Sequence, residues 1–117
     1  MDKDCSVYRT ADFIGKRWTL LILLELYKGN KKKRYSQIKN NLQEITPKIL
    51  SARLKELEKH KLINKKVDAK TFPVKCEYSL TKKGEDFIDV IKEIKQWTLK
   101  YDYNKECNNR DCIICRT

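Results

Sequence analysis

Long apolar runs are missing from this sequence. The longest, from Trp18 to Leu26, is interrupted by Thr19 and Glu25, and it is much shorter than the roughly twenty apolar residues that a membrane helix needs. The N-terminus, which reads Met-Asp-Lys-Asp, lacks the basic and apolar stretches of a secretory signal. These absences predict a soluble, cytoplasmic protein, and 117 residues suffice for about one domain.

Residues that usually carry catalysis are also scarce. The chain has a single histidine, His60, and only three glycines. It has no glycine-rich phosphate loop, and neither a Ser/His/Asp pattern nor a carboxylate pair with hydrolase spacing. The sequence therefore predicts that the protein is not an enzyme.

Five cysteines are present, and without an export signal they indicate thiols or metal ligands rather than a disulfide framework. Cys107, Cys112 and Cys115 have the spacing C-x₄-C-x₂-C, which occurs in iron–sulfur proteins and, in its C-x₂-C part, in zinc sites. A closed site needs a fourth ligand, from Cys5, Cys76 or a partner subunit. A redox disulfide and an inert thiol-rich tail remain alternatives, so an iron–sulfur cluster or zinc is a candidate cofactor only.

The positive charge is concentrated in the middle of the chain. Lysine and arginine number 27 against 16 acidic residues, which gives a net charge of +11. Between Lys28 and Lys75 there are 15 basic and 4 acidic residues, a difference of 15 − 4 = 11, so the remainder is neutral. A segregated positive field attracts polyanions, which favours nucleic acid first and an acidic membrane surface second.

The first half of the chain predicts three helices. Apolar spacing indicates a short helix over residues 7–14 and a second over 16–28, which is apolar on almost every side and so belongs in a core. Gly29-Asn30 ends the second helix, and residues 31–34 are expected to form an exposed basic loop. Ser36 is the expected N-cap of a third helix that reaches about Leu42.

Thr46-Pro47 marks the start of a helix that extends to about His60, because threonine caps free amides and proline suits the first helical position. At about 100° per residue, one face carries Leu50, Leu54, Leu57 and Lys61, and the opposite face carries Lys48, Ala52, Lys55 and Lys59 with Ser51 at its margin. Any amphipathic surface helix could show this pattern, but a position after a short turn in the basic segment favours the second helix of a helix-turn-helix.

The second half predicts a hairpin and a long helix. Residues 62–67 and 76–80 have strand patterns around a basic tip, and a helix with a wide apolar stripe follows Gly84. The stripe includes Ile88, Ile91, Ile94 and Trp97. It could pack on the first helix of the same chain, but a chain this small favours a second copy.

Four blocks, in order, resemble the HxlR-type regulators, which are relatives of the MarR group. The blocks are Ile14–Leu23, Arg34–Ile38, Leu50–Glu58 and Glu77–Gly84. The resemblance covers roughly residues 5–100.

This resemblance implies an α+β, mainly α, winged helix-turn-helix whose N- and C-terminal helices form a dimer interface. It also implies that the helix from Pro47 is the recognition helix, that the hairpin around Thr71 is the wing, and that Cys5 matches the cysteine with which some members sense oxidants. We divide the chain into a winged helix-turn-helix domain, residues 1–105, and a cysteine-rich tail, residues 106–117. The chain departs from the family where His60-Lys61 replaces an acidic residue and glycine.

The resulting hypothesis is a homodimeric transcription regulator that binds double-stranded DNA and responds to an oxidant or small-molecule effector through its thiols or a metal. Lys48, Ser51, Ala52 and Lys55 are expected to face the major groove, with Lys39, Lys70 and Lys75 nearer phosphates. Further expected DNA contacts are Ser36, Thr46 and Lys59. The alternatives are a winged-helix module that binds RNA or protein, and an iron–sulfur or zinc protein.

Overall fold

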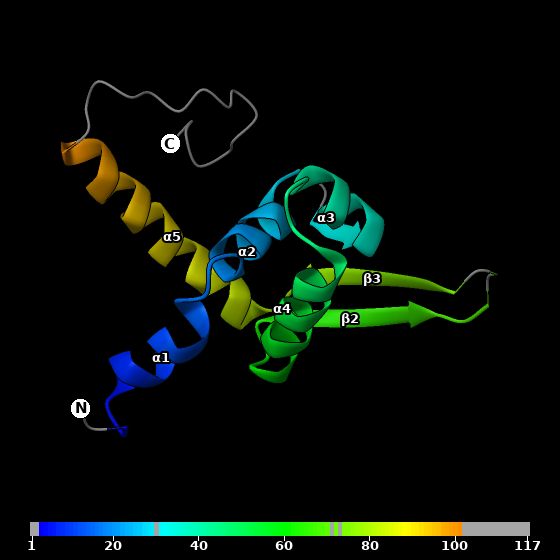
Figure 1. Ribbon diagram of the computed structural model, residues 1–117, viewed down its shortest axis with the longest axis horizontal. Coiled ribbons are helices and arrows are strands. Elements are labelled where there is room, and N and C mark those ends of the chain that lie inside the picture. Colours follow the sequence, from blue (N-terminus) through cyan, green and yellow to red (C-terminus); the bar gives the residue numbers. More distant parts are fainter. Residues whose placement is uncertain (1–2, 30, 71, 73, 102–117) are drawn as a thin grey trace.

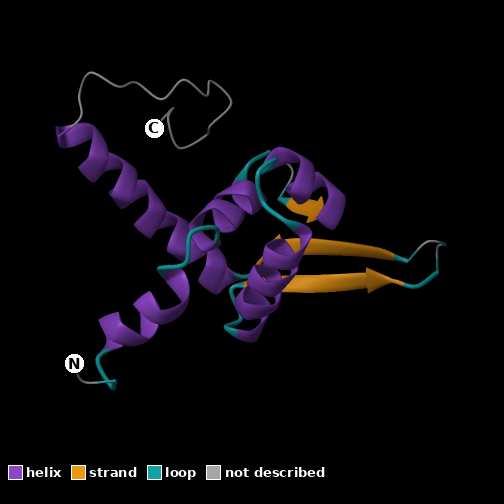
Figure 2. Cartoon of the chain, viewed as in Figure 1, coloured by secondary structure: helices purple, strands orange, loops and turns teal. Residues whose placement is uncertain are grey.

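The computed structural model describes residues 3–29, 31–70, 72 and 74–101. In these ranges the chain forms five helices and a three-stranded antiparallel sheet with the strand order β1-β3-β2 (Figure 1, Figure 2). The elements are α1 (Ser6–Ile14), α2 (Thr19–Tyr27), β1 (Lys32–Arg34), α3 (Tyr35–Asn41), α4 (Pro47–Lys59), β2 (Ile63–Asp68), β3 (Lys75–Leu80) and α5 (Lys82–Tyr101). This arrangement confirms the predicted winged helix-turn-helix, and none of the described helices is long and apolar enough to cross a membrane.

Helix α2 is the centre of the core, as its all-round apolar sequence predicts. Ile22, Leu23 and Leu26 are fully buried, and α2 contacts α3, α4, α5 and β3. The helix begins at Thr19 rather than at Lys16, because the residues before it form a turn closed by a hydrogen bond from the Thr19 amide to the Lys16 carbonyl. The core therefore extends from α2 to every layer of the domain.

A charged residue lies within this core helix. Glu25 is 6 % exposed, and its Oε1 accepts a hydrogen bond of 2.6 Å from Nδ2 of Asn41 in α3. The Lys33 ammonium donates to the Glu25 carbonyl at 2.6 Å, and burial lowers the pKa of Lys33. Since a buried carboxylate needs a hydrogen-bond partner, the Asn41 bond fixes α3 against α2. The separate bond from Lys33 to the main-chain carbonyl fixes β1 there.

The basic segment before α3 was predicted as a loop, and this prediction is wrong. Lys32–Arg34 form β1, which pairs antiparallel with β3 so that Arg34 lies opposite Glu77. A three-residue edge strand made of charged side chains has no apolar alternation to reveal it, although such strands are typical sheet edges. Ser36 is not the N-cap of α3 either: Arg34 occupies that position, and its amide donates to Oε1 of Gln37 at 2.9 Å.

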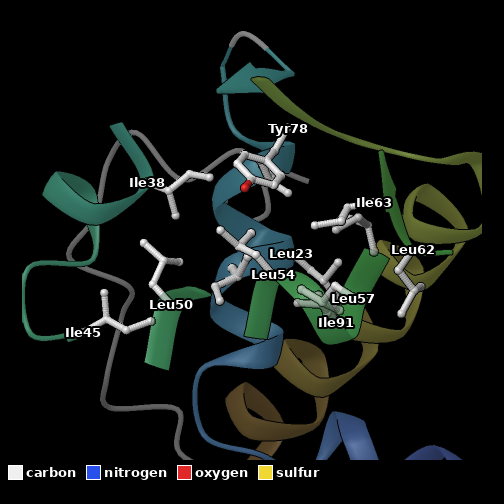
Figure 3. Packing of buried hydrophobic residues seen from close by; sticks show 13 residues of the cluster. Leu23, Ile38, Ile45, Leu50, Leu54, Leu57, Leu62, Ile63, Tyr78 and Ile91 are labelled. Atoms are coloured by element: carbon white, nitrogen blue, oxygen red, sulfur yellow. The ribbon is translucent and has the colours of Figure 1, made fainter. Parts of the chain in front are cut away.

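Helix α4 follows its prediction closely. The Thr46 hydroxyl accepts a hydrogen bond of 3.2 Å from the Ile49 amide, and Pro47 occupies the first turn. Leu50, Leu54 and Leu57 are buried, and Figure 3 shows them with the other labelled core side chains. Thus the leucine face of α4 anchors it on the core.

The end of α4 lacks the glycine that usually terminates such a helix. His60 is the C-cap, and Lys61 adopts the left-handed conformation with φ 62°. The Lys61 amide donates to the Glu58 carbonyl at 3.0 Å and the Leu62 amide to the Leu57 carbonyl at 2.9 Å, which is the Schellman pattern. The predicted place of Lys61 on the leucine face is wrong, because the helix ends before this residue. Lys61 is exposed.

The β2–β3 hairpin projects from the body of the molecule as the wing (Figure 1). Only the first residue of β2, Ile63, is buried, and the following residues through Asp68 are exposed. In β3, Tyr78 is buried against the core. The outer part of the wing is therefore a two-stranded ribbon without a hydrophobic layer.

Helices α1 and α5 diverge on the side of the molecule opposite the wing (Figure 1). Ile88 and Ile91 of α5 are buried within the chain, whereas Ile94 and Trp97 are 45 % and 67 % exposed. The expectation that all four pack on a partner is therefore wrong for Ile88 and Ile91, which belong to the buried core of the chain. The predicted boundary between residues 105 and 106 lies outside the described residues.

Candidate nucleic-acid interface

One face of α4 is exposed along its whole length. Thr46 begins this face, and its capping bond to the Ile49 amide orders the first turn. The predicted DNA contacts on the helix are all exposed: Thr46, Lys48, Ser51, Ala52, Lys55 and Lys59. The structure therefore brings these six residues together on one surface.

The lysines of this face carry uncompensated charge. Lys48, Lys55 and Lys59 form no ion pair with any residue that the structure describes. By contrast, Arg53 lies on the other side of α4 and its Nη1 is 2.8 Å from Oε1 of Glu56. Because the lysines of this face are not paired with any described acidic residue, the face can attract a polyanion.

Helix α3 lies beside the start of α4 and is fixed to it by Tyr35. The Tyr35 hydroxyl donates to the Pro47 carbonyl at 3.2 Å and accepts a longer hydrogen bond of 3.5 Å from Ser51. On α3, Ser36 is exposed, whereas Lys39 is half-buried. Tyr35 was not identified as a site residue, because its contact joins positions that no local sequence signal relates.

The wing contributes a basic hollow of about 540 Å³. Four basic and two acidic side chains line it together with two small apolar residues: Arg34, Lys66, Val67, Asp68, Ala69, Lys70, Lys75 and Glu77. Lys70 and Lys75 were predicted, whereas Arg34 and Lys66 were missed. Arg34 and Lys66 come together because β1 and β2 both pair with β3, where each lies opposite Glu77. The amide of Lys70 donates to the Asp68 carboxylate at 3.0 Å, which shapes the start of the turn, and Thr71 lies outside the described residues.

An apolar groove of about 380 Å³ separates α1 from α5. Its lining is made mainly of small and aliphatic side chains: Ser6, Val7, Thr10, Ala11, Ile14, Phe87, Val90 and Ile94. Val7 is 74 % exposed, and α1 buries none of its residues within the chain. Exposed apolar surface of this kind is typical of interaction sites.

The two described cysteines occupy different environments. Cys5 is a free, half-buried thiol at the N-cap of α1, next to the apolar groove. Cys76 is also free and packs against the core from β3, as its strand position predicts. The described residues contain no cluster of His, Cys, Asp and Glu that could hold a metal ion. The candidate metal ligands Cys107, Cys112 and Cys115 lie outside the described residues.

Comparisons with known proteins agree with this architecture. Residues 13–106 match the family model described as HxlR-like helix-turn-helix. The chain is 37 % identical over 93 residues to the uncharacterised HTH-type transcriptional regulator YvaP of Bacillus subtilis, covering 80 % of this chain and 83 % of YvaP.

Two solved structures are similar as well. A MarR-family transcriptional regulator from Porphyromonas gingivalis superposes with a TM-score of 0.75 at 32 % identity, covering 86 % of this chain and 95 % of the other. The redox regulator HypR in its oxidised form superposes with a TM-score of 0.68 at 30 % identity, covering 82 % and 96 %. The basic helix-turn-helix with its wing and the matches over most of the chain therefore lead to one conclusion: this transcriptional regulator belongs to the HxlR-like helix-turn-helix family.

Proposed function

We propose that the chain binds double-stranded DNA as a homodimer, with α4 in the major groove and the wing along the phosphate backbone. The observation that carries this proposal is the exposed face of α4, where Lys48, Lys55 and Lys59 have no ion-pair partner among the described residues. The hollow of the wing adds a second group of basic side chains. A charged helix beside a charged ribbon fits a duplex, in which a groove adjoins a phosphate ridge.

The side chains divide into two kinds of contact. Lys48, Ser51, Ala52 and Lys55 are assigned to base edges, since lysine can donate to guanine and a small methyl group can contact thymine. Lys39, Lys70 and Lys75 are assigned to phosphates, which position the protein without reading sequence. Ser36, Thr46 and Lys59 complete the expected DNA-contacting surface.

The proposed dimer uses the apolar groove between α1 and α5. The groove, whose lining includes the exposed Ile94, is an apolar surface that a second copy can cover. The exposed Trp97 of α5 adds to this surface. Two copies related by a twofold axis would place two α4 helices on a palindromic site. Light scattering should show a dimer at low micromolar concentration, and Ile94→Glu should shift it to a monomer; a compact wild-type monomer would contradict this assembly.

DNA binding is tested with a duplex that the wild type selects from a random library. Lys48→Ala and Lys55→Ala should each lower affinity for this duplex by about 1–3 kcal/mol and relax its sequence preference. Lys70→Ala should weaken all duplexes alike and reduce the dependence of log K on log salt. Lys82→Ala, at an exposed lysine outside these surfaces, is the matched control.

Two outcomes would redirect the proposal. If Lys48→Ala and Lys55→Ala keep their sequence specificity and Lys70→Ala loses affinity, the wing is the main DNA-recognition element. Equal binding of duplex RNA would favour the RNA-binding alternative.

Thiol chemistry is the proposed means of regulation. Cys5 is the N-cap of α1, one residue before the groove assigned to the dimer. A disulfide between Cys5 and a second cysteine, formed when the two thiols lose their protons and pass two electrons to the oxidant, would change how the subunits meet. The likeness to the redox regulator HypR supports this assignment. Mild oxidant should change the DNA affinity of the wild type, but not that of Cys5→Ser.

The tail cysteines are tested alongside Cys5. A variant with Cys107, Cys112 and Cys115 all changed to serine is compared with the wild type with oxidant and with a chelator. Bound iron or zinc in freshly purified wild type, absent from the triple variant, would support a metal at the tail, and colourless, metal-free protein would remove that role. If neither oxidant nor chelator changes the DNA affinity of the wild type, the protein is a regulator without a thiol sensor.

A further inference from the structure

The C-terminal end of helix α1 contacts the C-terminal end of α4. No residue of α1 is buried, but Phe13 and Ile14 at its end pack partly against the core. The ring of Phe13 stacks on the ring of His60, with centroids 4.0 Å apart and planes 12° from parallel. Because His60 is the C-cap of α4, this stack joins the end of α1 directly to the end of the recognition helix.

An ion pair lies beside the stack. Lys16, two residues after α1, places its Nζ 2.7 Å from Oε1 of Glu56 in the last turn of α4. Arg53 contacts the same oxygen at 2.8 Å. The hydrogen bond from Lys16 is the main reason why the pKa of Glu56 lies below its usual range. Two contacts of different chemistry thus fix the same end of α4.

We propose that Phe13 and His60, assisted by Lys16 and Glu56, are positioning residues that set the angle of the recognition helix relative to α1. This inference rests on the proposed function, because α1 lines the groove assigned to the second copy. Through these contacts, the way two chains meet at α1 determines where each α4 lies on DNA. The contact itself touches no residue assigned to base edges.

Because the contact lies at one end of α4, a small change in angle there displaces the other end of the helix. Helix α4 has 13 residues, so at about 1.5 Å per residue it is roughly 20 Å long. A tilt of about 10° around its C-terminal end would move its N-terminal end by roughly 3 Å. Hydrogen bonds to base edges tolerate only a few tenths of an ångström, and the two helices must stay about one DNA turn apart. A small tilt of α4 at His60 therefore produces a large displacement of Lys48.

The test compares two duplexes: the palindromic site that the wild type selects from a random library, and the same site with one half scrambled. Phe13→Ala and His60→Ala should each lower the preference for the palindrome over the half-site by about five- to ten-fold, with half-site affinity unchanged. His60→Phe keeps an aromatic stack and should retain the preference. Asp12→Asn, at an exposed neighbour of Phe13, is the control.

Three outcomes would overturn the inference, and they differ from one another. An unchanged preference in both alanine variants shows that the stack does not position α4. An equal loss of affinity for both duplexes, together with a lower midpoint of urea unfolding, shows that the stack only stabilises the fold. A wild type with no preference for any palindrome refutes the proposed dimeric DNA binding itself. Support requires a lost preference in the alanine variants, retention in His60→Phe, and a Phe13→Ala/His60→Ala double variant no worse than either single one.

Discussion

Replacing Lys61 with glycine should stabilise the protein. Lys61 has φ 62°, a conformation in which the Cβ atom of an ordinary residue crowds the following carbonyl. Both hydrogen bonds of the helix end use main-chain atoms, from the Lys61 amide to Glu58 and from the Leu62 amide to Leu57. The Thr81 hydroxyl also donates to the Lys61 carbonyl at 2.7 Å. Glycine at position 61 preserves all three bonds and removes the crowding.

The size of the effect follows from two opposing terms. The left-handed conformation costs an L-residue about 1–2 kcal/mol, and Lys61→Gly recovers this. Glycine is also more flexible in the unfolded chain, which costs about 0.5–1 kcal/mol. The net gain therefore lies between about 0 and 1.5 kcal/mol, and its midpoint of about 0.75 kcal/mol corresponds to a rise in Tm of roughly 3–6 °C for a domain of this size.

The gain is measured by urea unfolding at one fixed protein concentration, because an oligomer's apparent stability depends on concentration. Lys61→Ala is the matched control: it removes the same charge and side chain but keeps the Cβ atom. We expect Lys61→Gly to exceed Lys61→Ala by about 1 kcal/mol. Equal stabilities of the two variants would refute the argument from backbone conformation and assign any gain to the loss of lysine charge.

Two further predictions concern close packing and acid. Gly84→Ala should cost about 1–3 kcal/mol in thermal unfolding, because a Cβ atom there would lie 2.2 Å from the Leu62 carbonyl oxygen; the exposed control Lys82→Ala should change little, and a stable Gly84→Ala would contradict this packing. The hydrogen bond from Lys16 lowers the pKa of Glu56 from 4.5, so its stabilisation is complete above that pH and is lost as the pH falls through the lowered pKa. In urea unfolding at several pH values, the free energy of unfolding should fall less steeply with decreasing pH for Glu56→Gln than for the wild type. The same dependence on pH in both proteins would refute this linkage.

Local signals were sufficient to predict helix α4. Thr46 and Pro47 mark its start, and the spacing of Leu50, Leu54 and Leu57 identifies its buried face. Both signals act within one or two helical turns, so they do not depend on the rest of the fold. The exposed residues on the opposite face, which form most of the candidate site, follow from the same periodicity.

Tertiary contacts account for what the sequence did not reveal. β1 is a strand only because β3 lies beside it, and the role of Tyr35 depends on the distant Pro47 carbonyl. Glu25 looks like an interruption of an apolar run until Asn41 is seen to bind it. Similarly, the apolar stripe of α5 does not show that Ile88 and Ile91 are buried within the chain whereas Ile94 is exposed.

The outer wing has a consequence for how such regulators can diverge. Every residue of β2 after Ile63 is exposed, and exposed substitutions usually change stability by less than about 0.5 kcal/mol. Selection on folding therefore places little constraint on the side chains from Asn64 to Asp68. Duplicated copies of the gene can exchange charges there while the core remains intact. Helix α4 has no such freedom, because every third or fourth of its residues is also part of the core.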